Sequence, residues 1–191
     1  GWSYRKAINI TGSPGAGLGY QMQVIIKRNS GEDSGNTIYV GGNCREDFAD
    51  IRFTDADGNL LPYAIVYQTT DEANVWVKCS TVNLDSNSTI YLYYGNPSAT
   101  SQSSLEETFV FAEDWRDESL SRWTIETEGD PVYYADTGLQ LLCINTNATG
   151  ESITLASYSL SFPSSWIVED LMSNQGEKET FEIYQYTQWA S

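Results

Sequence analysis

The sequence contains no histidine, and only 10 lysine or arginine residues stand against 26 aspartate or glutamate residues, which gives 191 residues a formal net charge of −16. Without an imidazole the chain lacks the base of a serine or cysteine triad and the commonest ligand of zinc and iron sites. The scarcity of basic residues excludes nucleic acid as a partner, because phosphate contacts require a basic surface. No apolar run approaches the roughly 20 residues that cross a bilayer, so we expect no membrane span.

What the chain has in abundance is aromatic and β-branched residues in short alternating runs. Aromatic residues make up 13% and hydrophobic residues 40%, which is too many for a disordered chain. Apolar side chains recur at every second position, the period of a β-strand, and the segments between these runs are rich in glycine, asparagine and aspartate, the residues of turns. We find no convincing amphipathic helix. The sequence therefore predicts an all-β protein: a β-sandwich or jelly-roll module followed by a second β-sandwich.

The alternation also predicts the core of the first module. One parity of each strand must face the buried side of a sheet. The side chains that we expect to be buried are Tyr20, Met22, Val24, Ile26, Ile51, Phe53, Ile65, Val75, Val77, Ile90 and Leu92.

A small, polar, aperiodic segment near residues 96–108 predicts a linker. We therefore divide the chain into a module at residues 1–104 and an acidic β region at residues 105–191. Residues 1–108 carry 7 basic and 12 acidic side chains, whereas residues 109–191 carry 3 and 14. We predict further strands in this acidic half, around residues 123–125, 132–135, 139–144, 152–156, 166–168 and 181–186.

Cys44, Cys79 and Cys143 are an odd number of cysteines, which permits at most one internal disulfide. One hypothesis is that Cys44 pairs with Cys79, closing a loop that would stabilise the fold by roughly 3–4 kcal/mol in an oxidising environment. The alternative is that the three thiols are small buried hydrophobic groups.

Three Asn-X-Ser/Thr sequons, at Asn9, Asn87 and Asn147, predict N-glycosylation if the protein is secreted. The sequence also begins at Gly1 without a methionine, which suggests that a leader has been removed. Both features favour an extracellular or cell-surface location.

Two groups of oxygen-bearing side chains are candidate calcium sites, because hard cations prefer carboxylate and amide oxygens. The first consists of Asp55, Asp57 and Asn59, and the second of Glu113, Asp114 and Asp117. The first group does not follow the EF-hand spacing, so a plain hairpin turn is its alternative interpretation. A solvated acidic loop is the alternative for the second group. If the protein binds an ion, we expect calcium.

We expect no enzymatic activity. A glycosidase needs two carboxylates at a set separation, and the Glu-X-Asp-X-X-Glu strand of concanavalin-like glycosidases is absent from the sequence. Carbohydrate binding is a separate hypothesis, since aromatic rings stack on sugar faces, although the same residues are ordinary components of a sandwich core. The aromatic candidates are Trp76, Tyr91, Tyr93, Trp115, Trp123 and Trp189.

Several motifs in the first half resemble one family of extracellular β domains. These motifs are Trp2–Lys6, Cys44–Gly58, Leu61–Tyr63, Val75–Lys78 and Thr89–Pro97. In this order, over residues 1 to about 104, they resemble the family catalogued as domain of unknown function 2341. The resemblance implies a module of secreted or surface proteins of bacteria and archaea, often placed before a concanavalin-like (laminin G-like) jelly roll. It transfers no catalytic residues.

The segment Phe109–Trp123 resembles the opening of such a jelly roll. A complete jelly roll usually needs well over the 83 residues that remain from Phe109, so we expect this region to be incomplete unless a neighbouring chain completes it.

These observations favour a non-catalytic structural or assembly subunit of the cell surface, such as a self-associating filament or surface-layer protein. Its partners would be other copies of itself, joined by strand addition or edge packing. Two alternating segments are candidate donated strands, Tyr4–Ile10 and Phe181–Trp189. The alternative function is a carbohydrate-binding or adhesive module. The rival account of the incomplete second half is that the chain is a fragment of a longer surface protein.

Overall fold

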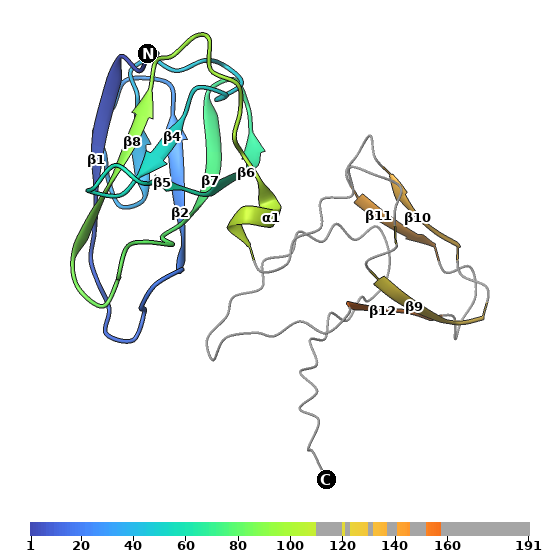
Figure 1. Cartoon of the computed structure of the whole chain (residues 1–191). Coiled ribbons are helices and arrows are strands. Elements are labelled where there is room, and N and C mark those ends of the chain that lie inside the picture. The colour runs from blue at the N-terminus through green and yellow to red at the C-terminus, as the bar shows by residue number, and fades with distance from the viewer. Residues whose placement is uncertain (110–119, 121–122, 130–131, 137–140, 146–151, 158–191) are drawn as a thin grey trace. The chain divides into compact units, whose positions relative to one another are not determined.

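The computed structural model describes residues 1–109, 120, 123–129, 132–136, 141–145 and 152–157. Its first part is a β-sandwich of two four-stranded sheets (Figure 1). The first sheet has the order β1-β8-β4-β5, with the strands Tyr4–Ile10, Ser88–Tyr94, Arg52–Thr54 and Leu60–Leu61. The second has the order β3-β2-β7-β6, with the strands Thr37–Tyr39, Gln21–Lys27, Glu72–Lys78 and Tyr63–Gln68. The prediction of an all-β protein is confirmed.

Neighbouring strands pair antiparallel throughout the sandwich except for β2 and β3, which run parallel. The pairing of β1 with β8 joins residues far apart in the sequence, with Tyr4 opposite Tyr94 and Ile10 opposite Ser88. The first and last strands of the module are therefore neighbours, and β1 forms one edge of its sheet.

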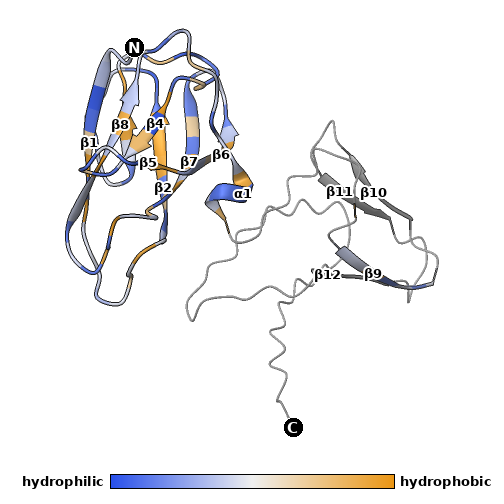
Figure 2. Ribbon diagram, in the orientation of Figure 1, coloured by the Kyte–Doolittle hydropathy of each residue, from blue (hydrophilic) through white to orange (hydrophobic). Residues whose placement is uncertain are grey.

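The core lies between the two sheets and follows the predicted alternation. Eight of the expected residues are buried: Val24, Ile26, Ile51, Phe53, Val75, Val77, Ile90 and Leu92. Met22 and Ile65 are partly buried and pack against this cluster. Figure 2 shows apolar residues on β2, β4 and β8, whereas β1 is mostly hydrophilic.

Tyr20 was expected in the core, and that prediction is wrong. Its side chain is 43% exposed because it precedes β2, which begins at Gln21, so the alternation of that strand does not extend to it. A second departure lies in β6, where a bulge between Ile65 and Tyr67 shifts the register and leaves Val66 and Tyr67 exposed. A bulge adds a residue to one strand, so the period of two ends there.

The segment that we interpreted as a linker is fastened along the sandwich. Arg52 donates from Nη2 to the Thr100 carbonyl at 2.6 Å, and the Ile65 amide donates to Ser103 Oγ at 2.8 Å. Arg45 likewise donates from Nη1 to a carbonyl of this segment, that of Ala99, at 3.0 Å. Most of these bonds use backbone groups of the segment. Its side-chain composition therefore does not predict that the segment is bound to the sandwich.

The fastened segment ends in one helical turn, α1 (Leu105–Thr108), with Ser104 as its N-cap. Gln21 donates from Nε2 to the Thr108 carbonyl, and the ring of Phe109 meets Trp76 edge-on at 6.0 Å between centroids. The α1 turn and Phe109 thus pack on the outer face of the second sheet.

Four further strands are described in the acidic half. They are β9 (Trp123–Glu128), β10 (Val132–Asp136), β11 (Leu141–Asn145) and β12 (Ser152–Ser157). Strand β9 pairs antiparallel with β12, and β10 with β11. The strands predicted around residues 123–156 are therefore confirmed, while those predicted at residues 166–168 and 181–186 lie outside the described residues. None of the described residues belongs to a helix long and apolar enough to cross a membrane.

Candidate functional site

The outer surface of β1 and β8 gathers polar and aromatic side chains. Six side chains of these strands, which we call the β1–β8 face, point away from the core: Arg5, Ala7, Asn9, Thr89, Tyr91 and Tyr93. In the register of the sheet, Arg5 lies opposite Tyr93, Ala7 opposite Tyr91 and Asn9 opposite Thr89. The residues between them, such as Ile8 and Leu92, are buried, so the same alternation that builds the core presents this face to solvent.

Arg5 is exposed and lies over the tyrosines of the β1–β8 face. Its guanidinium carbon is 4.7 Å from the centroid of the Tyr91 ring, a cation–π geometry. Interaction with the Tyr93 side chain raises the pKa of the guanidinium above its ordinary value. The face therefore combines a fixed positive charge with two half-buried phenol rings, groups suited to contact with acidic chains or with sugar rings.

The backbone of β1 is the long open edge of the sandwich. Within the described part of the chain, β8 is the only strand that pairs with β1, so its other side is free over seven residues. The other three edges are shorter or partly covered: β5 has two residues and β3 has three, and the six-residue β6 is met by Ser103 at Tyr63 and Ile65. In Figure 1, β1 accordingly forms the outer left margin of the module.

The inward side of β1 carries a lysine that binds the neighbouring segment before β3. Lys6 Nζ lies 2.8 Å from both carboxylate oxygens of Asp33 and 2.6 Å from the Tyr39 carbonyl oxygen. These contacts tie the edge of one sheet to the adjoining edge of the other. They fix β1 in place without occupying the groups that its outer edge presents.

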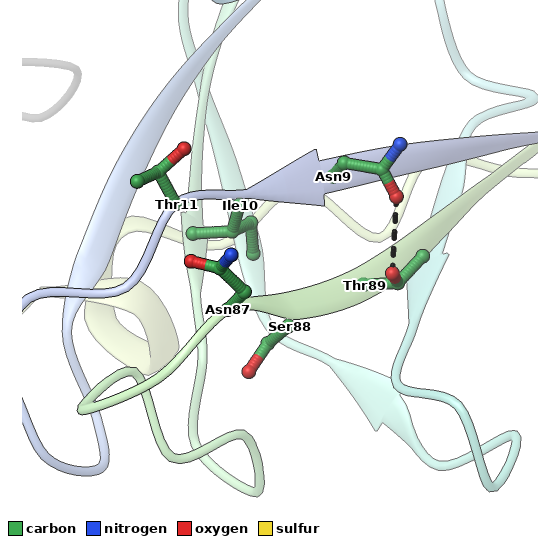
Figure 3. A pocket seen from close by; sticks show the side chains of 6 residues that line it. All are labelled: Asn9, Ile10, Thr11, Asn87, Ser88 and Thr89. Carbon is green, nitrogen blue, oxygen red and sulfur yellow. Dashed lines mark hydrogen bonds between the residues drawn. The ribbon is translucent and has the colours of Figure 1, made fainter.

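Two of the predicted glycosylation sequons meet at the C-terminal end of β1. Asn9, Ile10 and Thr11 line a surface hollow of about 310 Å³ together with Asn87, Ser88 and Thr89 (Figure 3). Thr89 Oγ1 lies 3.1 Å from Asn9 Oδ1, and the Gly12 amide donates to Asn87 Oδ1 at 3.0 Å. The third sequon, at Asn147, lies outside the described residues.

The first predicted calcium group, Asp55, Asp57 and Asn59, lies in a tight turn. The Asp55 carboxylate accepts hydrogen bonds from the backbone amides of Asp57 and Asn59, from Asn59 Nδ2 at 2.8 Å and from Thr81 Oγ1 at 2.6 Å. The hydrogen bonds from Thr81 and Asn59 lower the pKa of the carboxyl to about 2. Its oxygens are thus engaged by donors of the protein itself, the arrangement of a hairpin turn.

No cluster of three or more histidine, cysteine or acidic side chains arranged to hold a metal occurs among the described residues. The second predicted calcium group, Glu113, Asp114 and Asp117, lies outside them.

The predicted disulfide between Cys44 and Cys79 is not formed. Both thiols are buried and free, and each has a different neighbour: Cys44 Sγ donates to Asp50 Oδ1 at 3.0 Å, whereas Cys79 Sγ lies 3.9 Å from the sulfur of Met22. Cys44 and Cys79 therefore match the alternative interpretation, in which the cysteines are small buried groups.

Cys44 and Asp50 line a second hollow of about 250 Å³. A thiol beside a carboxylate is also the arrangement of a catalytic nucleophile and its base. Burial, followed by the nearby negative charge of Asp50, raises the pKa of the thiol far above its usual range, so the thiolate does not form near neutral pH. Asp50 is also occupied by the amides of Arg45 and Gly95. The geometry holds two loops together and does not activate the sulfur.

The other aromatic candidates for sugar binding are placed less favourably. Trp76 lies on the outer face of the second sheet, where Phe109 packs against it. Trp115 and Trp189 lie outside the described residues, and Trp123 is the first residue of β9. Of the six residues that sequence reasoning named, Tyr91 and Tyr93 are the two that the structure brings together on one surface.

Sequence reasoning did not identify Arg5 as part of this surface, nor the meeting of the two sequons. Arg5 and Asn9 belong to one alternating run, and Thr89 and Tyr91 belong to another. This alternation was the only sequence signal that these four side chains lie on the exposed faces of strands. Which strand pairs with which is decided by contacts across about 80 residues, as the bond between Asn9 and Thr89 shows.

Residues 47–126 match the model of one protein family, described as a domain of unknown function (DUF2341). The match begins at Asp47, ahead of β4, and ends at Glu126 within β9, so it includes the fastened segment between the two halves. This part of the chain is similar to that family. The motif Trp2–Lys6 lies outside the match, and the jelly roll expected from Phe109 onward stays a prediction. No curated protein and no solved structure matches the chain.

Proposed function

We propose that this chain is a non-catalytic structural subunit of the cell surface, and that copies associate when a strand of one copy adds to the free edge of β1 in another. The observation that carries the proposal is that the seven-residue strand β1 has a strand partner on one side only among the described residues. Every second residue of an edge strand directs its backbone N–H and C=O away from the sheet, and these groups form hydrogen bonds with an added strand.

The distribution of charge supports a second copy as the partner. The β1 edge carries the exposed Arg5, whereas residues 109–191 hold 14 acidic and only 3 basic side chains. The acidic half of one copy is therefore attracted to the β1 edge of the next, although the net charge of −16 makes whole copies repel. Calcium would reduce that repulsion and promote association at an extracellular location.

The oligomeric state of the full chain tests this proposal. Size-exclusion chromatography with light scattering, over a range of protein concentrations and with calcium or a chelator, should show species larger than a monomer. Ala7→Glu should reduce them, because a charged side chain on the exposed surface of an edge strand discourages strand addition and a carboxylate there also repels the acidic half of the next copy. Ser13→Glu adds the same charge in an exposed turn and should leave association unchanged.

A chain that stays monomeric under all these conditions would exclude assembly. Equal loss of association in Ala7→Glu and Ser13→Glu would show that charge, and not the β1 edge, controls it.

Carbohydrate binding is a second candidate, supported by the placement of Tyr91 and Tyr93 two residues apart on the β1–β8 face. Binding of the chain to a glycan array would test it. The variants Tyr91→Ala and Tyr93→Ala should lose binding, whereas Tyr67→Ala, which removes an exposed tyrosine of β6, should keep it. An array on which the unaltered chain binds no glycan would remove this candidate.

A further inference from the structure

The two sequons of the sandwich occupy mirrored positions on neighbouring strands. In the antiparallel register, Asn9 lies opposite Thr89 and Ile10 lies opposite Ser88, so the asparagine of one sequon faces the threonine of the other. Continued by one pair, the same register sets Thr11 against Asn87. Diagonal neighbours across an antiparallel pair are about 7–8 Å apart. The two asparagines therefore lie close together at one end of the β1–β8 face.

Both asparagines hold the fold through their carbonyl oxygen. Asn87 Oδ1 faces the Gly12 amide, and because a backbone amide can only donate, the side-chain atom facing it must be the oxygen. Asn9 Oδ1 faces Thr89 Oγ1. In the described part of the chain, neither Nδ2 makes a hydrogen bond, and both side chains are exposed at the hollow in Figure 3.

We propose that Asn9 and Asn87 form a twin N-glycosylation site, with two glycans carried side by side on one molecule. In the transfer, Nδ2 of each asparagine forms a bond to the anomeric carbon of an oligosaccharide carried on a lipid phosphate or diphosphate. The bond between that carbon and the phosphate oxygen breaks, the lipid phosphate leaves with the electron pair, and Nδ2 releases one proton. The substituted nitrogen leaves both carbonyl oxygens free to keep their contacts with Thr89 and Gly12.

The order of events follows from the pairing of β1 with β8. Once the strands have paired, both sequons lie at the ends of a regular ladder, so transfer precedes that pairing. Strand β1 must wait for a partner about 80 residues further along the chain, which leaves Asn9 accessible for longer than Asn87. We therefore expect Asn9 to carry a glycan in at least as large a fraction of molecules as Asn87.

Mass spectrometry of the protein purified from the cells that make it tests the proposal. Intact-mass measurement and glycopeptide mapping should find molecules modified at Asn9 and Asn87 together. Asn9→Asp and Asn87→Asp should each remove the mass of one glycan, while the carboxylate oxygen keeps the hydrogen bond of the lost amide. Circular dichroism of these variants should stay unchanged, which separates loss of the sugar from loss of the fold.

Thr89→Ser is the matched control, because serine preserves both the sequon and the hydroxyl that faces Asn9. It should keep the glycan on Asn87, whereas Thr89→Val should lose it. The proposal is overturned if native material holds no molecule with both sites modified, or if the Asp variants leave the intact mass of the glycans unchanged. This result does not depend on whether the protein assembles.

Discussion

Asp50 is a buried carboxylate that joins two loops, and its replacement should cost more stability than that of any exposed acidic residue. Its side chain is 1% exposed. Asp50 Oδ1 accepts from Cys44 Sγ at 3.0 Å and from the Arg45 amide at 2.9 Å, while Oδ2 accepts from the Gly95 amide at 3.0 Å. In Asp50→Asn the single amide oxygen can accept either from Cys44 and Arg45 or from Gly95. Nδ2 then faces the remaining donor and cannot accept from it.

The expected cost follows from these contacts. A hydrogen bond to a charged group contributes about 1.5–3 kcal/mol, and a buried donor without a partner costs at least about 1 kcal/mol more. Asp50→Asn should therefore lower the free energy of unfolding by about 3 kcal/mol, and Asp50→Ala, which removes all three bonds, by about 4–5 kcal/mol. For a chain of this size, 3 kcal/mol corresponds to a fall in Tm of roughly 6–12 °C.

Urea unfolding followed by tryptophan fluorescence and circular dichroism measures this effect. Asp47→Asn is the matched control, because Asp47 lies three residues away with its carboxylate half exposed beside Arg45, and its loss should cost less than about 1 kcal/mol. If Asp50→Asn were as stable as Asp47→Asn, the reasoning that buried donors require this carboxylate would be refuted.

Three further predictions concern the same module. Burial raises the pKa of Cys79 to about 11 and also raises that of Cys44, so both thiols should resist alkylation at pH 8 until urea unfolds the chain. Peptide mapping distinguishes these sites from Cys143, and rapid labelling of Cys44 or Cys79 in the folded protein would contradict this. Asp55 has a folded pKa of about 2 against about 3.9 unfolded, so its stabilisation is present above pH 4 and lost as the pH falls through 2. The stability difference between the unaltered chain and Asp55→Asn should shrink over that interval, and a constant difference would refute the assignment. Gly95→Ala should destabilise by more than about 1 kcal/mol in the same urea assay, because φ is +79° and an added Cβ would lie 2.5 Å from the Tyr4 ring; unchanged stability would disprove the clash.

The sequence alone determined the class of fold and most of the core. Alternation in β2, β4, β7 and β8 assigns Val24, Phe53, Val75 and Leu92 to the buried side, and the structure confirms this. Alternation is a local property, because a strand with one buried face must place every second side chain there. It fails at Tyr20, which precedes β2, at the bulge after Ile65, and in β4, whose three residues are all buried.

The tertiary structure decided which of these strands meet. The pairing of β1 with β8 sets Arg5 beside Tyr91, brings Asn9 against Thr89, and leaves β1 as the open edge. Nothing in either strand specifies its partner, since many alternating segments fit one another equally well and only the closed sandwich selects among them.

The same reason explains why the sequence did not predict the neighbours of the cysteines or the bonds of the polar segment after β8. Whether Cys44 reaches Cys79 or Asp50 depends on how distant loops pack, and the structure gives Asp50. Residues 96–108 have the composition of a linker, but the Thr100 carbonyl accepts from Arg52 and the Gln102 amide donates to the Tyr63 hydroxyl. Composition reports what a segment's own side chains prefer, whereas these bonds depend on donors and acceptors that only the folded chain brings within reach.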